Sequence, residues 1–260
     1  MYRDDRDITS EIPAYRRMLA EITPSRHAAQ VTYTQTLDVT RTLAWIEEQR
    51  QATGQRITLL HVFLAAAGRL LHTRPKLNRY VEGSRFYQRS KVRLSFSAKK
   101  AMVDGSEIVA LFVEPGPDIT PLQVCEEVSQ RLAPPRAGEV LRQEKENDLL
   151  LKIPGIFLGP IVRLALWLGR RHWLPAALVD PDPMFCSLFV ANLGSVGLEH
   201  AHHHLYEWGN CPFFAVIGRV EEGKVRVGWT FDERVEDGMA CALSLEGLKE
   251  LIEDPSRFDG

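Results

Sequence analysis

The stretch TFDERVEDG, residues 230–238, places two acids, an arginine, two more acids and a glycine directly after an apolar run. That run, residues 224–232, alternates apolar and polar side chains as a half-buried strand does. Residues 239–253 repeat apolar side chains every three or four positions, which is typical of an amphipathic helix. The stretch is therefore the loop of a strand–loop–helix unit. Its composition alone is compatible both with a solvated acidic turn and with a functional loop.

Outward from this unit, the same periodicities predict alternating helices and strands. Further helices are predicted at residues 13–22, 40–54, 59–73 and 121–132. Further strands are predicted at residues 31–39, 85–89, 92–98, 107–115, 185–194 and 213–220. Thr40 and Thr58 are the expected helix N-caps, and Gly54 is the expected end of a helix. With no internal repeat and no low-complexity linker, residues 1–260 are expected to form one α+β domain.

Composition excludes several classes of function. The chain has 260 residues with a net charge of −2, so no global field recruits nucleic acid or an anionic membrane surface. Its four cysteines show no C-x-x-C pair, which argues against a disulfide framework or a cysteine zinc site and fits a reducing compartment. The charged N-terminus has no apolar signal segment, so we expect a cytoplasmic protein.

Five short motifs then occur in a fixed order: RPKLN at 74–78, ANLG at 191–194, AVIG at 215–218, FDERVEDG at 231–238 and LIEDP at 251–255. In order and approximate spacing they resemble the catalytic domain of the dihydrolipoamide acyltransferases, the core subunits of 2-oxo acid dehydrogenase complexes. Each motif alone is weak, but together they cover about residues 15–258. The resemblance implies a two-layer domain of the chloramphenicol acetyltransferase type, with a mixed sheet packed by helices.

The resemblance also implies partners. Both related families form closed threefold rings with the active site between subunits, so we expect a homotrimer. Because the sequence begins almost at the catalytic fold, we expect it to carry no lipoyl or subunit-binding domain. A role in a multienzyme complex would require a second acyltransferase-like or lipoyl-bearing subunit.

The chain departs from the family at both chemical positions. In the family, a histidine of the acidic loop takes a proton from a thiol, and a serine on a facing strand stabilises the oxyanion. Here Glu233 and Ala191 stand at these positions. The resemblance implies that Asp237 and Gly238 still support the loop, with Asp237 buried against Arg16 or Arg17, Gly238 without room for a side chain, and Glu233 turned towards the subunit boundary. Asn192 and Gly194 of the ANLG motif are kept as structural residues.

These replacements predict a loss of ordinary activity. The pKa of a glutamate is about 4.3, far below that of a thiol at about 8.5, so Glu233 is a poorly matched base. Loss of a base costs about 10³-fold in rate and loss of an oxyanion donor roughly 10²–10³-fold. We expect a trimeric scaffold or ligand-binding homologue that holds no cofactor firmly and takes coenzyme A or acyl-coenzyme A. The alternative is an active coenzyme A-dependent acyltransferase, on an unknown acceptor, whose base is Glu233 or a nearby histidine.

Histidines cluster in EHAHHHLYEWGNCP, residues 199–212. His202 and His204 would point to one side of an extended strand, which is an acceptable spacing for metal ligands. No second ligand pair completes a site, so no metal is expected. Structural packing and replacement of the missing base both remain open for these side chains.

An apolar insertion separates the helix at 121–132 from the ANLG strand, at about residues 134–183. Residues 156–168 are too short to span a bilayer. Basic residues and two tryptophans follow, so residues 156–173 fit an interfacial helix in peripheral contact with a membrane. Because apolar residues lie all round this helix, we favour a cover over an apolar groove of the domain or of a partner subunit. In either case the insertion is expected to narrow the cavity that the family keeps open for pantetheine.

Overall fold

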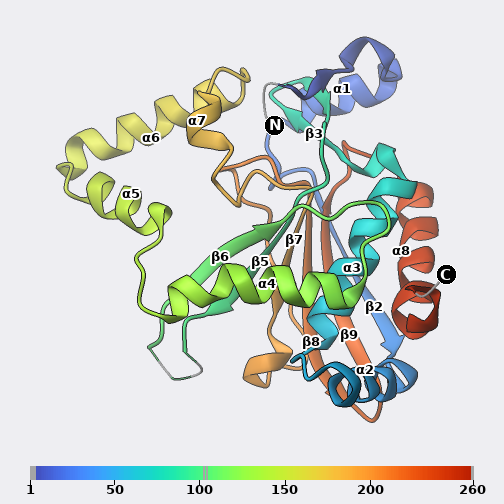
Figure 1. Cartoon of the computed structure of the whole chain (residues 1–260). Coiled ribbons are helices and arrows are strands. Elements are labelled where there is room, and N and C mark those ends of the chain that lie inside the picture. Colours follow the sequence, from blue (N-terminus) through green and yellow to red (C-terminus); the bar gives the residue numbers. More distant parts are fainter. Residues whose placement is uncertain (1–3, 102, 104, 259–260) are drawn as a thin grey trace.

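The computed structural model describes residues 4–101, 103 and 105–258, and a six-stranded mixed sheet forms its centre (Figure 1). The strand order is β2-β9-β8-β7-β5-β6. The strands are β2 (Gln30–Asp38), β5 (Leu94–Lys99), β6 (Ile108–Val113), β7 (Leu188–Asn192), β8 (Phe213–Glu221) and β9 (Lys224–Asp232). β7 runs parallel to both β5 and β8, and the other neighbours are antiparallel. The predicted α+β class with a mixed sheet is confirmed.

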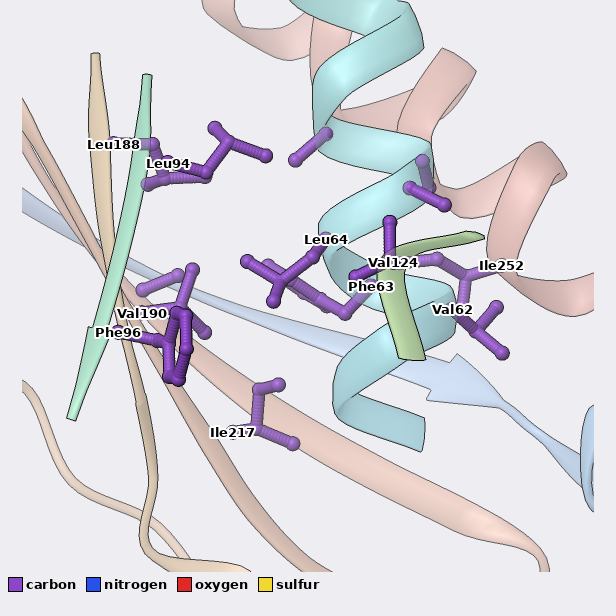
Figure 2. Close-up of a cluster of buried hydrophobic side chains, with 14 of the residues drawn as sticks. Val62, Phe63, Leu64, Leu94, Phe96, Val124, Leu188, Val190, Ile217 and Ile252 are labelled. Carbon is purple, nitrogen blue, oxygen red and sulfur yellow. The ribbon is translucent and has the colours of Figure 1, made fainter. Parts of the chain in front are cut away.

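Four helices cover one face of this sheet: α2 (Thr40–Thr53), α3 (Leu59–Thr73), α4 (Pro121–Arg136) and α8 (Gly238–Glu253). α3 is the most apolar of them, and nine of its residues, His61 among them, are buried. Figure 2 shows its Phe63 and Leu64 directed towards apolar side chains of β5 and β7. The two predicted layers therefore share one large core.

The predicted helix ends are largely confirmed. Gly54 closes α2 in the left-handed conformation, at φ 71°, which glycine adopts without a steric penalty. Thr58 caps α3, and its backbone N–H donates to Nδ1 of His61 at 3.0 Å. The expectation for Thr40 was wrong, because Val39 is the N-cap and Thr40 is the first helical residue. Asp38 replaces it as the polar partner, accepting from the Thr40 N–H at 3.0 Å.

A second, three-stranded sheet holds β1 (Arg6–Asp7), β4 (Arg85–Gln88) and β3 (Arg79–Glu82), in the order β1-β4-β3. The strand predicted at residues 85–89 is therefore confirmed, but the expectation of one mixed sheet that carries all the predicted strands was wrong. The reason is local: β3 and β4 form a tight hairpin in which Glu82 pairs with Arg85 across Gly83 at φ 60°. A short hairpin closes with little entropy loss, so it is favoured over pairing with a distant strand.

The insertion forms three helices, α5 (Arg142–Leu151), α6 (Gly155–Gly169) and α7 (Ala176–Val179). In Figure 1, α5 and α6 extend away from the mixed sheet, and no residue of α6 is buried. Within this chain α6 packs only through its end, where Leu168 contacts Leu174 and Phe185, so it does not cover a groove of its own domain along its length. The other part of the expectation, that it covers a groove of a partner subunit, stays a prediction. Within the described residues, no helix has the length and apolar character needed to cross a membrane.

α1 (Ala14–Ile22) packs beside the small sheet through Ala20, in a separate cluster with Ile8, Phe86 and Val235. This contact brings the N-terminal helix against the loop that follows β9. The acidic loop is thus held between the two layers and α1.

Candidate functional site

The acidic loop begins with a buried ion pair. Arg234 and Asp232 are 2% and 1% exposed, and their side chains meet in a bidentate arrangement at 2.8 and 2.6 Å. The remaining guanidinium nitrogen of Arg234 donates to the carbonyl of Thr23, after α1, at 2.9 Å. Sequence reasoning missed this pair, although its D-x-R spacing lies inside the FDERVEDG motif. Two of the loop's charges thus serve to hold its backbone.

Arg16 forms the second anchor of the loop. Its guanidinium donates to the carbonyl of Val235 at 2.9 Å and meets Glu236 at 3.1 Å and Asp237 at 3.5 Å. The side chains of Arg16 and Glu236 are 7% and 10% exposed, whereas that of Asp237 is 54% exposed. An arginine does reach Asp237, but its expected burial was wrong, and Arg17, the other expected partner, is exposed.

Asp237 is exposed because it is the N-cap of α8. Its carboxylate accepts from the N–H of Ala240 at 2.9 Å, and a helix end of this kind faces solvent. Gly238 is the first residue of α8, but a Cβ placed there would meet nothing within 4 Å. The expectation that Gly238 has no room for a side chain was therefore wrong.

Glu233 differs from the other acids of the loop. Its backbone N–H donates to the carbonyl of Ala29 at 3.0 Å, which fixes its place beside the start of β2. Its carboxylate is partly exposed and has no hydrogen bond or ion pair to any described residue. Its orientation towards a neighbouring subunit stays a prediction.

Ala191 lies on β7, paired with Val216 of β8, and is 6% exposed. It faces the side of the sheet opposite the helices, in an apolar cluster that includes Phe189, Leu205 and Phe214. β8 separates its strand from β9, which leads to Glu233. Ala191, which motif spacing predicts at the position of the family serine, thus offers only a methyl group among apolar neighbours.

The next residues of the motif are structural, as expected. A Cβ on Gly194 would lie 2.2 Å from the carbonyl oxygen of Gly218, so the two motif glycines allow a close backbone approach. Asn192 stabilises the turn after β7, accepting from the backbone N–H of Ser195 at 3.3 Å and from its hydroxyl at 2.7 Å.

The histidine segment crosses the outer face of the sheet. His202 is held at the edge by the hydroxyl of Thr34 at 3.3 Å and the carbonyl of Tyr33 at 3.2 Å. His204 is exposed, and its pKa is lowered by partial burial and by the neighbouring His203 and His27. The described residues contain no group of three or more potential ligands for a metal ion. His202 lies over β9 on this outer face, since a Cβ on Gly228 would meet its ring at 3.2 Å, but neither histidine singled out from the sequence packs on the apolar face around Ala191.

His203 does reach that face. Its ring stacks on Phe214 at 4.2 Å between centroids, and Phe214 stacks on Phe189 at 5.0 Å in the cluster around Ala191. Its Nδ1 lies 2.8 Å from the carbonyl of His204. Because a carbonyl only accepts, Nδ1 carries a proton in this contact and Nε2 is left with a lone pair. Nε2 lies 3.3 Å from the hydroxyl of Tyr206.

A cavity of about 660 Å³ opens on the helical side of the sheet, where β5 and β7 end. Its apolar wall includes Phe96 and Leu132, and its polar groups include Asn192 and Ser195. Three cations line it: Arg56, Lys99 and Arg136. No aspartate or glutamate is found among its described lining residues. The cavity is therefore suited to an anion with an apolar portion.

The N-terminus of α3 also borders the cavity, through Thr58 and His61. Burial, together with the nearby charge of Arg50, lowers the pKa of His61 to about 4. His61 is thus neutral at pH 7 and adds no charge of its own. The positive end of the helix dipole adds to the field of the three cations.

Comparisons with known proteins agree with this architecture. The family model of the 2-oxoacid dehydrogenases acyltransferase (catalytic domain) matches residues 7–102. A search of curated proteins found no match. The expected resemblance to the acyltransferase catalytic domain is confirmed by the family match and by solved structures.

Three solved structures illustrate the likeness. The dihydrolipoamide acetyltransferase of Azotobacter vinelandii, studied for the roles of a serine, a histidine and an asparagine in its catalytic mechanism, is 16% identical, with 95% of this chain and 92% of that chain covered and a TM-score of 0.61. The cubic core of the pyruvate dehydrogenase multienzyme complex is 15% identical, with 97% and 91% covered and a TM-score of 0.59. A chloramphenicol acetyltransferase is 10% identical, with 95% and 99% covered and a TM-score of 0.54. At these identities, what is shared with the solved structures is the fold.

Proposed function

We propose that this protein is a ligand-binding homologue of the acyltransferase core that does not carry out ordinary thiol-dependent acyl transfer. The observation that carries the proposal is the environment of Ala191, whose methyl group is buried among apolar side chains. A tetrahedral oxyanion at that position would have no side-chain hydroxyl to stabilise it. Glu233 replaces the imidazole base with a carboxylate, which repels a thiolate instead of assisting its formation.

The ligand class follows from the cavity beside Asn192. Its three cations match phosphate groups, and its apolar wall matches a pantetheine or acyl chain. We therefore propose coenzyme A or an acyl-coenzyme A as a reversibly bound ligand.

The assembly is proposed to be a homotrimer. The first half of β2 is an exposed sheet edge on which Val31 and Tyr33 are 38% and 50% exposed, and such an edge is usually covered in a stable protein. A related core assembles into a cube in a multienzyme complex. Sedimentation at micromolar concentration tests the proposal, and a monomeric mass would refute it. A lipoyl-bearing subunit is the partner that a role in such a complex would need.

A second candidate function rests on His203. Its ring lies over the face that carries Ala191, with Nδ1 on the carbonyl of His204 and Nε2 beside the hydroxyl of Tyr206. An imidazole with its other nitrogen bound to a carbonyl is oriented as a general base would be. In this alternative the protein is an active coenzyme A-dependent acyltransferase on an unknown acceptor, with His203 or Glu233 as the base.

Turnover and binding assays separate the two functions. The wild-type chain is incubated with acetyl- and longer acyl-coenzyme A, release of free thiol is followed, and coenzyme A binding is measured by calorimetry. Binding without thiol release above the uncatalysed rate supports the first proposal. Thiol release that is abolished by Glu233→Gln or His203→Gln would overturn it and identify the base.

The cavity has its own test. Arg56→Gln with Arg136→Gln is expected to weaken coenzyme A binding by roughly tenfold or more, since each removes a charge-assisted contact. Arg17→Gln, on an exposed arginine of α1 outside the cavity, is the matched control and should bind as the wild type does. Equal binding by all three proteins would place the ligand elsewhere.

Glu233→His with Ala191→Ser, which introduces the two reacting residues of the family, is expected to restore weak acyl transfer.

A further inference from the structure

The insertion exposes an unusually apolar surface. Ten large apolar side chains between residues 149 and 173 are exposed: Leu149, Leu150, Leu151, Ile156, Phe157, Ile161, Val162, Leu164, Trp167 and Trp173. Soluble proteins rarely expose so many neighbouring apolar groups unless the surface binds something. Neither the proposed ligand cavity nor the acidic loop includes any residue of this surface.

The charges of the insertion are one-sided. Residues 149–179 contain four cations and no aspartate or glutamate. Two of these cations, Lys152 and Arg163, are exposed and have no ion pair among the described residues. The acids of α5 lie before this segment, where Glu144 pairs with Lys100 at 2.6 Å and Glu146 with Arg142 at 2.5 Å. Asp148, next to Leu149, is exposed, and Arg170 pairs with Glu207 at 3.7 Å, so the unpaired charge within residues 149–179 is positive and is carried by Lys152 and Arg163.

Aromatic and basic side chains meet where α6 ends. The guanidinium of Arg171 lies 3.9 Å from the centre of the Trp167 ring, and Trp167 meets Trp173 edge to face at 5.7 Å. Tryptophan and arginine in this arrangement present an apolar body and a polar tip, which suits the boundary between acyl chains and headgroups. The same end is fixed to the domain, because Leu168 packs against the cluster of Leu174 and Phe185.

We propose that the helices α5 and α6 dock this protein on the surface of an anionic lipid bilayer. α6 has 15 residues and is about 22 Å long, which is too short to cross a hydrocarbon core of about 30 Å. It therefore lies in the plane of the interface, with its apolar side chains among the acyl chains and its cations among the headgroups. A second copy of the chain is a poorer partner, because it would bring the same cations together.

Vesicle flotation with the full chain tests this proposal. Vesicles of phosphatidylcholine with about one-third phosphatidylglycerol are compared with vesicles of phosphatidylcholine alone. The protein is expected to float with the anionic vesicles, to bind the neutral ones at least tenfold more weakly, and to dissociate as salt is raised. Equal flotation with both vesicles, or none with either, would overturn the proposal.

Variants assign the contact to α6. Phe157→Asp with Leu164→Asp replaces two side chains that are 60% and 56% exposed, and it should abolish flotation. Met18→Asp with Ile22→Asp, on α1, replaces side chains that are 60% and 68% exposed and should leave flotation unchanged. If both double variants float like the wild type, α6 is not the docking element.

The cations are tested separately. Lys152→Gln with Arg163→Gln should weaken binding by about 25-fold, since each basic residue near an anionic surface contributes about fivefold. Sedimentation without lipid is run in parallel. A lipid-free oligomer that dissociates with Phe157→Asp and Leu164→Asp would show that α6 contacts another copy, and this outcome would also overturn the proposal.

Discussion

The acidic loop and the insertion differ in which side chains they bury: the loop buries charged ones, and the insertion exposes apolar ones. In the loop, Asp232, Arg234 and Glu236 are charged and almost fully buried, and each has a partner within hydrogen-bonding distance. In α6, large apolar side chains are exposed and no residue is buried. The buried charges of the loop therefore stabilise the fold, and they do so independently of the residue at position 233. Apart from the end of α6, where Leu168 packs against Leu174 and Phe185, the apolar side chains of α6 are not buried by their own domain, so their exposure points to a partner.

The largest effect is expected from breaking the buried pair of the loop. Asp232→Ala should lower the free energy of unfolding by about 3–5 kcal/mol, because Arg234 would remain buried without its carboxylate. Urea denaturation measures this loss. The double variant Asp232→Ala with Arg234→Met should lose less than Asp232→Ala alone, because it leaves no unpaired charge. A loss below 1 kcal/mol for Asp232→Ala would show that the loop is not held by this pair.

The next effect concerns His61, whose buried ring has a pKa of about 4 in place of its ordinary 6.5. The unfolded chain binds a proton more readily than the folded one between these values. The contribution of neutral His61 to the free energy of unfolding is therefore fully present above pH 6.5. It decreases as the pH falls towards 4, by about 3 kcal/mol in all.

His61→Gln provides the control for this pH dependence. Glutamine at the third helical position can still accept from the backbone N–H of Thr58, so the cap of α3 is preserved. The difference in unfolding free energy between wild type and variant should change across pH 4–6.5 and be constant above it. Parallel curves over the whole range would show that His61 is not the group responsible.

A smaller effect is expected at Asp237. Because its side chain is half exposed and acts as an N-cap, Asp237→Ala should cost about 1 kcal/mol. Asp237→Asn, which retains an N-cap oxygen, should cost only a few tenths of that value. A loss as large as that of Asp232→Ala would mean that Asp237 carries the anchor of Arg16 after all.

The fold was readable from the sequence because local pattern and tertiary structure agree. The first four residues of β9 alternate exposed and buried side chains as the sequence alternates, and β7 and β8, which pair with each other, are two strongly apolar runs. The small sheet was missed because Arg79–Glu82 is only four residues long and has no alternating pattern. Its place depends on a hairpin partner, which periodicity does not reveal.

The site was readable in position and less so in detail. Motif spacing alone singles out Glu233, Ala191 and Asp237, whose role as a site stays a prediction. The spacing does not predict which of the neighbouring acids is buried. Glu236 and Asp237 are adjacent, and their exposure differs only because of the way in which the end of β9 turns into α8. Likewise, His203 and His204 are adjacent in the chain, and only the path of the segment across the sheet places His203 on Phe214.

The smallest effect on stability is expected in the insertion. Phe157→Asp with Leu164→Asp should change the free energy of unfolding by less than about 0.5 kcal/mol, as for other exposed positions, since neither side chain is buried in the domain. Comparable large apolar residues in the core would cost about 2–5 kcal/mol when truncated to alanine. Repeating the unfolding measurement with anionic vesicles should increase the difference in stability between the wild type and the double variant. Lipid that binds only the folded chain raises the apparent stability of the wild type by mass action, and the double variant should lose this gain. A large loss of stability without lipid would show instead that α6 packs within its own molecule or against another copy.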